Sequence, residues 1–183
     1  MYRYRLNDVV EVIGHVRECP LIRFDGKHEY VSDWFGEKLH EAHVATVLRD
    51  VFALAGSGVV PAFALLACDR ELAPPAYVLY VDSEADDATL MSAASIIDQR
   101  LRANFHYDYA RILGQLGPVR VFRTEGAAAA WLATGVAAGQ RAGGVKPLAL
   151  DRRDGWSQRF RGGFIPTPSR NTPSGSAPLR RAP

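Results

Sequence analysis

Long apolar runs and paired cysteines are both missing from this chain of 183 residues. No apolar run approaches the roughly 20 residues that a helix needs to span a bilayer, and the arginine-bearing start is not followed by the apolar segment of a secretion signal. We therefore expect a cytoplasmic protein that does not bind membranes. The two cysteines, Cys19 and Cys68, belong to no CxxC motif, which indicates reduced, packed thiols rather than a zinc site or a disulfide framework.

Short motifs that cradle phosphate or carry a nucleophile are missing as well. The sequence contains no GxSxG, no GxxxxGK(S/T) and no GxGxxG that opens a helix. His40 and His43 lie three positions apart with Glu41 between them, which is not the HExxH spacing of a zinc-binding helix. We therefore assign no metal ligand and expect no phosphate-binding loop within this chain.

The net charge of +2 is divided unevenly along the chain. Residues 152–183 carry seven arginines and one acid, whereas residues 1–151 have a net charge of −4. The basic end is rich in proline, serine, threonine and glycine and has little to bury. We expect residues 164–183 to form a disordered, solubilising tail, and the mildly acidic remainder does not favour nucleic acid as a partner. Contact of the arginine-bearing tail with RNA is the weaker alternative.

Apolar periodicity predicts an α+β fold. Apolar positions recur at helical spacing in residues 44–55 and again in residues 90–101, and each set forms one face of a helix. Further runs are typical of strands and of one alanine-rich helix: 21–24, 61–68, 76–81, 119–123 and 125–138. This order predicts a ferredoxin-like βαββαβ sandwich with an extra C-terminal helix, preceded by a short β segment and followed by the disordered tail.

One aspartate and two lysines are candidate nucleotide ligands. Asp8 offers the paired acceptors that suit ribose hydroxyls, although the residues alone favour an aspartate that simply ends a strand or turn. Lys38 follows Gly36, where a backbone can approach a ligand closely; the alternative is a solvated lysine at a helix start. Lys146 stands between a glycine pair and Pro147, which fits a loop that swings a lysine into a site or an ordinary exposed loop. Lysine is scarce here, three against nineteen arginines, which favours a specific use of its compact ammonium.

Several separated segments carry a resemblance to a known family. They are residues 2–12 (YRYRLNDVVEV), 20–27 (PLIRFDGK), 31–44 (VSDWFGEKLHEAHV), 104–107 (NFHY), 113–119 (LGQLGPV) and 144–147 (GVKP). In this order they resemble the Gretchen Hagen family, the auxin-responsive acyl acid amido synthetases of plants and their bacterial relatives. The resemblance covers roughly residues 2–165 and only the C-terminal portion of that family.

The resemblance implies an activity and a set of ligands. It implies that ATP, expected with Mg²⁺, and a carboxylic acid form an acyl-adenylate, which an amino acid then converts into an amide. By this match Asp8 holds the ribose, Lys38 approaches the nucleotide from the small C-terminal domain, and Lys146 acts during adenylation. Lys27 stands where the family commonly has a nucleotide-binding arginine, and Asn7 stands where it usually has glycine before the aspartate.

The same resemblance divides the chain into parts. Residues 1–25 are the expected last strands of the large adenylating domain, residues 26–163 the mobile cap domain, and residues 164–183 the tail. The chain looks truncated and is expected to be inactive alone, as a gene fragment or as the partner of a separately encoded large domain. The alternative is a non-enzymatic ferredoxin-like module that binds a ligand or a protein through its exposed sheet.

Overall fold

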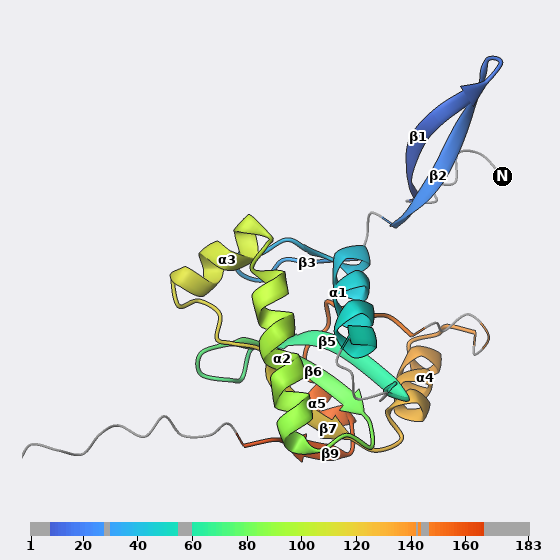
Figure 1. The fold of residues 1–183 in the computed structure, drawn as a ribbon. Helices are drawn as coiled ribbons and strands as arrows, with labels where there is room; N and C mark the ends of the chain where they lie inside the picture. The colour runs from blue at the N-terminus through green and yellow to red at the C-terminus, as the bar shows by residue number, and fades with distance from the viewer. Residues whose placement is uncertain (1–7, 28–29, 55–59, 142, 144–146, 167–183) are drawn as a thin grey trace, which may run out of the picture.

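A five-stranded sheet forms the centre of the fold (Figure 1). The computed structural model describes residues 8–27, 30–54, 60–141, 143 and 147–166. The strand order is β8-β5-β6-β7-β9, and the strands are β5 (Phe63–Asp69), β6 (Ala76–Asp82), β7 (Arg120–Thr124), β8 (Leu150–Asp151) and β9 (Gly162–Phe164). The β5–β6 and β7–β9 pairs are antiparallel, whereas β5–β8 and β6–β7 are parallel. The mixed sheet places the molecule in the α+β class, as the sequence predicts.

Two helices, α1 (Glu41–Leu54) and α2 (Asp87–Leu101), lie side by side on one face of this sheet (Figure 1). Their buried apolar positions are those with helical spacing in the sequence: Val44, Val47, Leu48, Val51, Leu90, Ala93, Ala94, Ile97 and Leu101. Each fully buried Val, Leu or Ile side chain stabilises the fold by about 1.5–3 kcal/mol. This face is the main core, and the short α3 (Phe105–Ile112) adds Tyr107 and Ala110 to it.

The opposite face of the sheet is covered by aromatic side chains. Trp131 of α4 (Ala127–Ala137) stacks on Trp156 of α5 (Trp156–Arg159), with ring centroids 4.9 Å apart. Phe160 stacks on the same Trp156 ring and meets Tyr80 of β6 edge-on. Because both faces are covered, β5 and β6 are buried along almost their whole length, which explains their continuous apolar sequences.

The N-terminal strands β1 (Asp8–Val16) and β2 (Cys19–Lys27) form an antiparallel hairpin that lies away from the sheet and its helices (Figure 1). Glu11 and Arg23 form an ion pair across it. Val12 is paired with Ile22, and these two side chains are 55% and 56% exposed. A two-stranded hairpin is only marginally stable by itself, and this one exposes apolar side chains on its surface.

The strand expected at residues 21–24 lies in this hairpin and not in the central sheet. In the central sheet β6 and β7 pair directly with each other, β8 forms the edge beside β5, and β9 forms the other edge. These two edge strands have two and three residues, too few for a recognisable alternation. The later part of the expected order, two strands, a helix and a strand, is present as β5, β6, α2 and β7, and the extra helix is α4.

The boundary expected at residue 164 falls within the fold. Phe164 is the last residue of β9, and Ile165 is buried. Residues 167–183 of the expected tail lie outside the described residues. In the part of the chain that the structure describes, no helix combines the length and apolarity required to cross a membrane.

Candidate functional site

Lys38 lies at the end of a loop closed by two very short strands. The strands β3 (Val31–Ser32) and β4 (Leu39–His40) pair antiparallel, so the intervening residues 33–38 form a tight loop just before α1. Gly36 has φ +86° and Lys38 has φ +44°. The left-handed conformation costs a non-glycine residue roughly 1–2 kcal/mol. The surrounding structure must therefore impose this conformation on Lys38.

The side chain of Glu37 holds the loop from the inside. Its carboxylate is completely buried, and it accepts hydrogen bonds from the loop's own backbone. The Trp34 N–H lies 3.0 Å from each carboxylate oxygen, and the Phe35 N–H donates to Oε2 at 2.7 Å. A buried carboxylate is costly unless such donors surround it. Glu37 and the loop backbone therefore stabilise each other.

Tyr77 of β6 connects this loop to the central sheet. Its hydroxyl hydrogen-bonds to Ser32 Oγ at 2.6 Å and donates to Glu37 Oε1 at 2.5 Å. Burial, followed by the negative charge of Glu37, raises the pKa of Tyr77 well above its ordinary value. The phenol therefore stays protonated over the physiological range and remains a donor to Glu37.

The ammonium group of Lys38 is directed outward. Nζ lies 2.8 Å from Asp33 Oδ2, and the lysine side chain is 53% exposed. An exposed ion pair of this kind contributes about 0–1 kcal/mol. Lys38 can therefore exchange Asp33 for another anion, such as a phosphate, at little cost.

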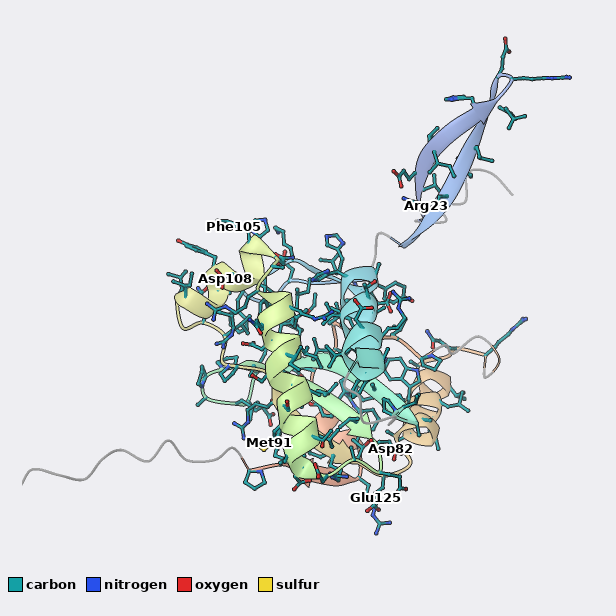
Figure 2. All side chains as sticks on the ribbon, viewed as in Figure 1. Arg23, Asp82, Met91, Phe105, Asp108 and Glu125 are labelled. Atoms are coloured by element: carbon teal, nitrogen blue, oxygen red, sulfur yellow. The ribbon has the colours of Figure 1, made fainter. Side chains whose placement is uncertain are left out.

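An aromatic and cationic surface borders the same loop. The Arg70 guanidinium lies 4.0 Å from the centre of the Trp34 ring, and its Nε donates to Asp154 at 2.7 Å. The helix α3, whose N-cap Asn104 bonds to the Lys38 carbonyl, begins with Phe105, which is 74% exposed and lies at the surface of the molecule in Figure 2. Tyr109 stacks against Phe105 with ring centroids 6.1 Å apart.

Asp8 and Lys27, expected as separate nucleotide ligands, are paired across the hairpin. The register of β1 and β2 places their Cα atoms opposite each other at its open end. Two residues separate Lys27 from Tyr30, whose carbonyl accepts from the Glu41 N–H at the start of α1. The chain spans at most about 3.6 Å per residue, so the Lys27 Cα lies within about 11 Å of the Tyr30 Cα. The Asp8–Lys27 end of the hairpin is thus tethered close to the base of the Lys38 loop.

The remaining candidate residues add little to the description of this site. Lys146 lies outside the described residues. His43 is half-buried on α1, and burial, followed by the nearby His40, lowers its pKa. Among the described residues no group of three or more His, Cys, Asp or Glu side chains has an arrangement that suits a metal ion.

Sequence reasoning missed the residues that hold the Lys38 loop. Glu37 resembles any surface glutamate in the sequence, and Tyr77 resembles a core residue of an apolar strand. The one available signal was the charged Glu37-Lys38 pair directly after Gly36. Glycine is the usual residue where a loop must adopt a left-handed conformation, so Gly36 marks such a position in the sequence.

Comparisons with known proteins reveal a likeness in structure alone. No protein-family model matches the sequence, and no curated protein matches it. Among solved structures, the GH3.15 acyl acid amido synthetase is similar with a TM-score of 0.72 and 18% identity, over 91% of this chain and 31% of that chain. The AtGH3.15 acyl acid amido synthetase in complex with 2,4-DB gives a TM-score of 0.69 and 16% identity, over 90% and 32%. The chain thus shares the fold of about a third of these synthetases.

Proposed function

We propose that this chain is the C-terminal cap of an ATP-dependent ligase that joins a carboxylic acid to an amino acid through an acyl-adenylate. The fold shared with about a third of an acyl acid amido synthetase supports this function, and it agrees with the C-terminal portion of that enzyme. Such a cap supplies a few mobile groups, whereas the phosphate-binding loop and the acid pocket belong to the larger part of the ligase.

The observation that carries the proposal is the geometry of Lys38. Its ammonium is half exposed, weakly held by Asp33 and presented by a loop that buried hydrogen bonds fix. Adenylation builds negative charge on phosphate, and a prepositioned cation stabilises that charge without further reorganisation. Lys38 therefore suits a nucleotide phosphate, and ATP supplies the adenylyl group that activates the acid.

The hairpin has the composition expected of strands that belong to a larger sheet. Val10, Val12 and Ile22 expose apolar surface, and the register pairs Asp8 with Lys27 at the open end of the hairpin. We assign β1 and β2 to the sheet of the adenylating domain, with Asp8 on the ribose hydroxyls. Lys27 and Lys146 complete the proposed set of nucleotide-binding cations, and Mg²⁺ would enter with the phosphates, as is usual for this ion.

ATP–pyrophosphate exchange tests the proposal. The assay uses a panel of carboxylic acids, with mass spectrometry of amides formed from an amino acid mixture. We expect no exchange from this chain alone and measurable exchange when it is joined to an adenylating domain, either one encoded beside it or that of the GH3.15 synthetase. Exchange by the chain alone, or no exchange by any joined form, would contradict the proposal.

Lys38→Ala then tests the site. We expect the exchange rate of the joined enzyme to fall about 100-fold, as for the loss of one preorganised electrostatic donor. Arg100→Ala is the matched control, because Arg100 is a comparably exposed cation that pairs with Asp50 at 3.2 Å. Equal losses in both variants would show that the effect is not specific to Lys38.

A further inference from the structure

We propose that Glu37 is a positioning residue that holds the backbone of Lys38 in its left-handed conformation and thereby aims the Lys38 ammonium. The consequence for catalysis rests on the proposed function, whereas the effect on the Lys38 side chain is a property of this chain alone.

The carboxylate of Glu37 contacts the loop backbone and the strand that supports it. It is completely buried, and its partners are two loop amides and the Tyr77 hydroxyl. In the described part of the chain no lysine or arginine forms an ion pair with it. The charge is therefore balanced by hydrogen bonds that require residues 34 and 35 to keep their present orientation.

Both ends of the Lys38 residue are fixed by this arrangement. On its N-terminal side Glu37 is anchored in the interior, and on its C-terminal side Leu39 is completely buried in β4. The Lys38 carbonyl also accepts a hydrogen bond from Asn104 Nδ2 at 3.3 Å. With φ at +44°, the Cα–Cβ bond of Lys38 has one direction, outward beside Asp33. Without the Glu37 contacts the strained backbone would relax, because an L-residue prefers negative φ.

A glutamate at position 37 offers two negatively charged acceptor oxygens to the donors of the loop, which a neutral residue does not. Glutamine has one acceptor oxygen in place of two and carries no charge, so the charge-assisted hydrogen bonds from the Trp34 and Phe35 N–H groups become weaker neutral ones. Its NH₂ group would face the Tyr77 hydroxyl, which could then no longer donate to this position, and the loop would be weakened without removing the fold's apolar core. Glu37→Gln thus changes the orientation of the Lys38 side chain more than it changes the stability of the whole protein.

The first test uses the protein alone and its small number of lysines. Reductive ¹³C-methylation labels Lys27, Lys38 and Lys146 besides the N-terminal amine, and it keeps the positive charge. Lys38→Arg identifies the Lys38 signal in the NMR spectrum. In the wild-type protein we expect Asp33→Asn to shift this signal, because the ion pair is lost. In the Glu37→Gln background we expect Asp33→Asn to leave it unchanged, because Lys38 no longer lies against residue 33.

Asp151→Asn is the matched control for a general loss of structure. Asp151 is also a buried carboxylate that accepts from a nearby backbone N–H, that of Arg153 at 2.8 Å. In this background the response of Lys38 to Asp33→Asn should persist. Tyr77→Phe is a milder variant, which keeps the loop amides bonded to Glu37 and should give an intermediate response. An undiminished response in both Glu37→Gln and Tyr77→Phe would overturn the inference.

A double-mutant cycle in the joined ligase supplies the kinetic test. We expect Glu37→Gln to lower pyrophosphate exchange about 10- to 100-fold, as misplacement of a catalytic group by roughly 1 Å does. The double variant Glu37→Gln with Lys38→Ala should match Lys38→Ala within about twofold, because Glu37 acts through Lys38. Additive losses would overturn the positioning role. No effect of Lys38→Ala would instead contradict the proposed function and leave the NMR result standing.

Discussion

Asn104 donates a hydrogen bond from its side-chain amide to the backbone carbonyl of Lys38, with Nδ2 and O 3.3 Å apart. The same side chain is the N-cap of α3, and its Oδ1 accepts from the N–H groups of His106 and Tyr107. One residue thus joins the start of a helix to the loop that presents the candidate catalytic lysine. A change at Asn104 is therefore expected to affect both.

Asn104→Ala should destabilise the protein by about 1 kcal/mol, the usual cost of losing an N-cap side chain. It should also broaden or shift the NMR signal of methylated Lys38. Urea unfolding and the lysine spectrum measure the two effects. Asp86→Ala is the control, because Asp86 caps α2 through the Thr89 N–H at 2.7 Å and has no described contact with Lys38. A Lys38 shift of the same size in Asp86→Ala would contradict the specific connection.

Lys38→Gly should separate function from stability. Glycine adopts positive φ without strain, which offsets the larger entropy that glycine loses on folding. We expect the free energy of unfolding to stay within about 1 kcal/mol of the wild type, while pyrophosphate exchange by the joined ligase falls as for Lys38→Ala. Urea titration and the exchange assay check this pair of outcomes. A loss of stability above about 2 kcal/mol would show that Lys38 serves the fold.

Stability should fall as the pH rises above about 9, first through Cys68 and then through the tyrosines. Burial raises the pKa of Tyr77 and Tyr107, and it raises the pKa of Cys68 to about 12. In the unfolded chain these groups lose their protons near their ordinary pKa, whereas the folded protein retains them. The unfolded state then binds fewer protons, so the free energy of unfolding decreases with pH by about 1.4 kcal/mol per pH unit for each such group. Urea unfolding between pH 8 and 11 measures the slope.

Two variants test which groups cause this dependence of stability on pH. Tyr107→Phe removes one buried phenol, which donates to Asp98 Oδ1 at 2.7 Å. It should therefore reduce the slope by the contribution of one group, about 1.4 kcal/mol per pH unit. Tyr109→Phe, at an exposed position of the same helix, is the control variant. An unaltered slope in Tyr107→Phe would contradict the assignment.

Gly162→Ala should disrupt the pairing of the edge strand β9 with β7. A Cβ atom at Gly162 would lie 1.9 Å from the Arg123 carbonyl oxygen of β7, and φ is +149°. The backbone must move, so we expect a loss of more than about 2 kcal/mol. Gly163→Ala is the neighbouring control, because nothing lies within 4 Å of a Cβ there. Thermal or urea unfolding of the two variants measures the difference, and equal stabilities would show that β9 contributes little.

Periodicity predicted the elements with long, regular patterns. The α1 and α2 faces and the strands β5, β6 and β7 were all visible, since apolar side chains repeat at the period of the element that buries them. β8 and β9 were not visible, because two or three residues carry no period. The hairpin was visible as strands, but its separation from the central sheet depends on pairing between strands, which local sequence does not encode.

By itself the sequence determined that this protein is an α+β domain, that lysine is scarce in it, and that one of the few lysines, Lys38, closely follows Gly36. It also carries the resemblance to amido synthetases. Those properties are local, since they depend on residue type, spacing and turn chemistry. Only the tertiary structure decided that Glu37 is buried, that Tyr77 reaches it from β6, and that Lys38 is held in a left-handed conformation with its ammonium outward. These relationships join residues about 40 positions apart, as Tyr77 and Glu37 are. Burial then makes their hydrogen bonds obligatory, because a buried carboxylate must find donors wherever the fold places them.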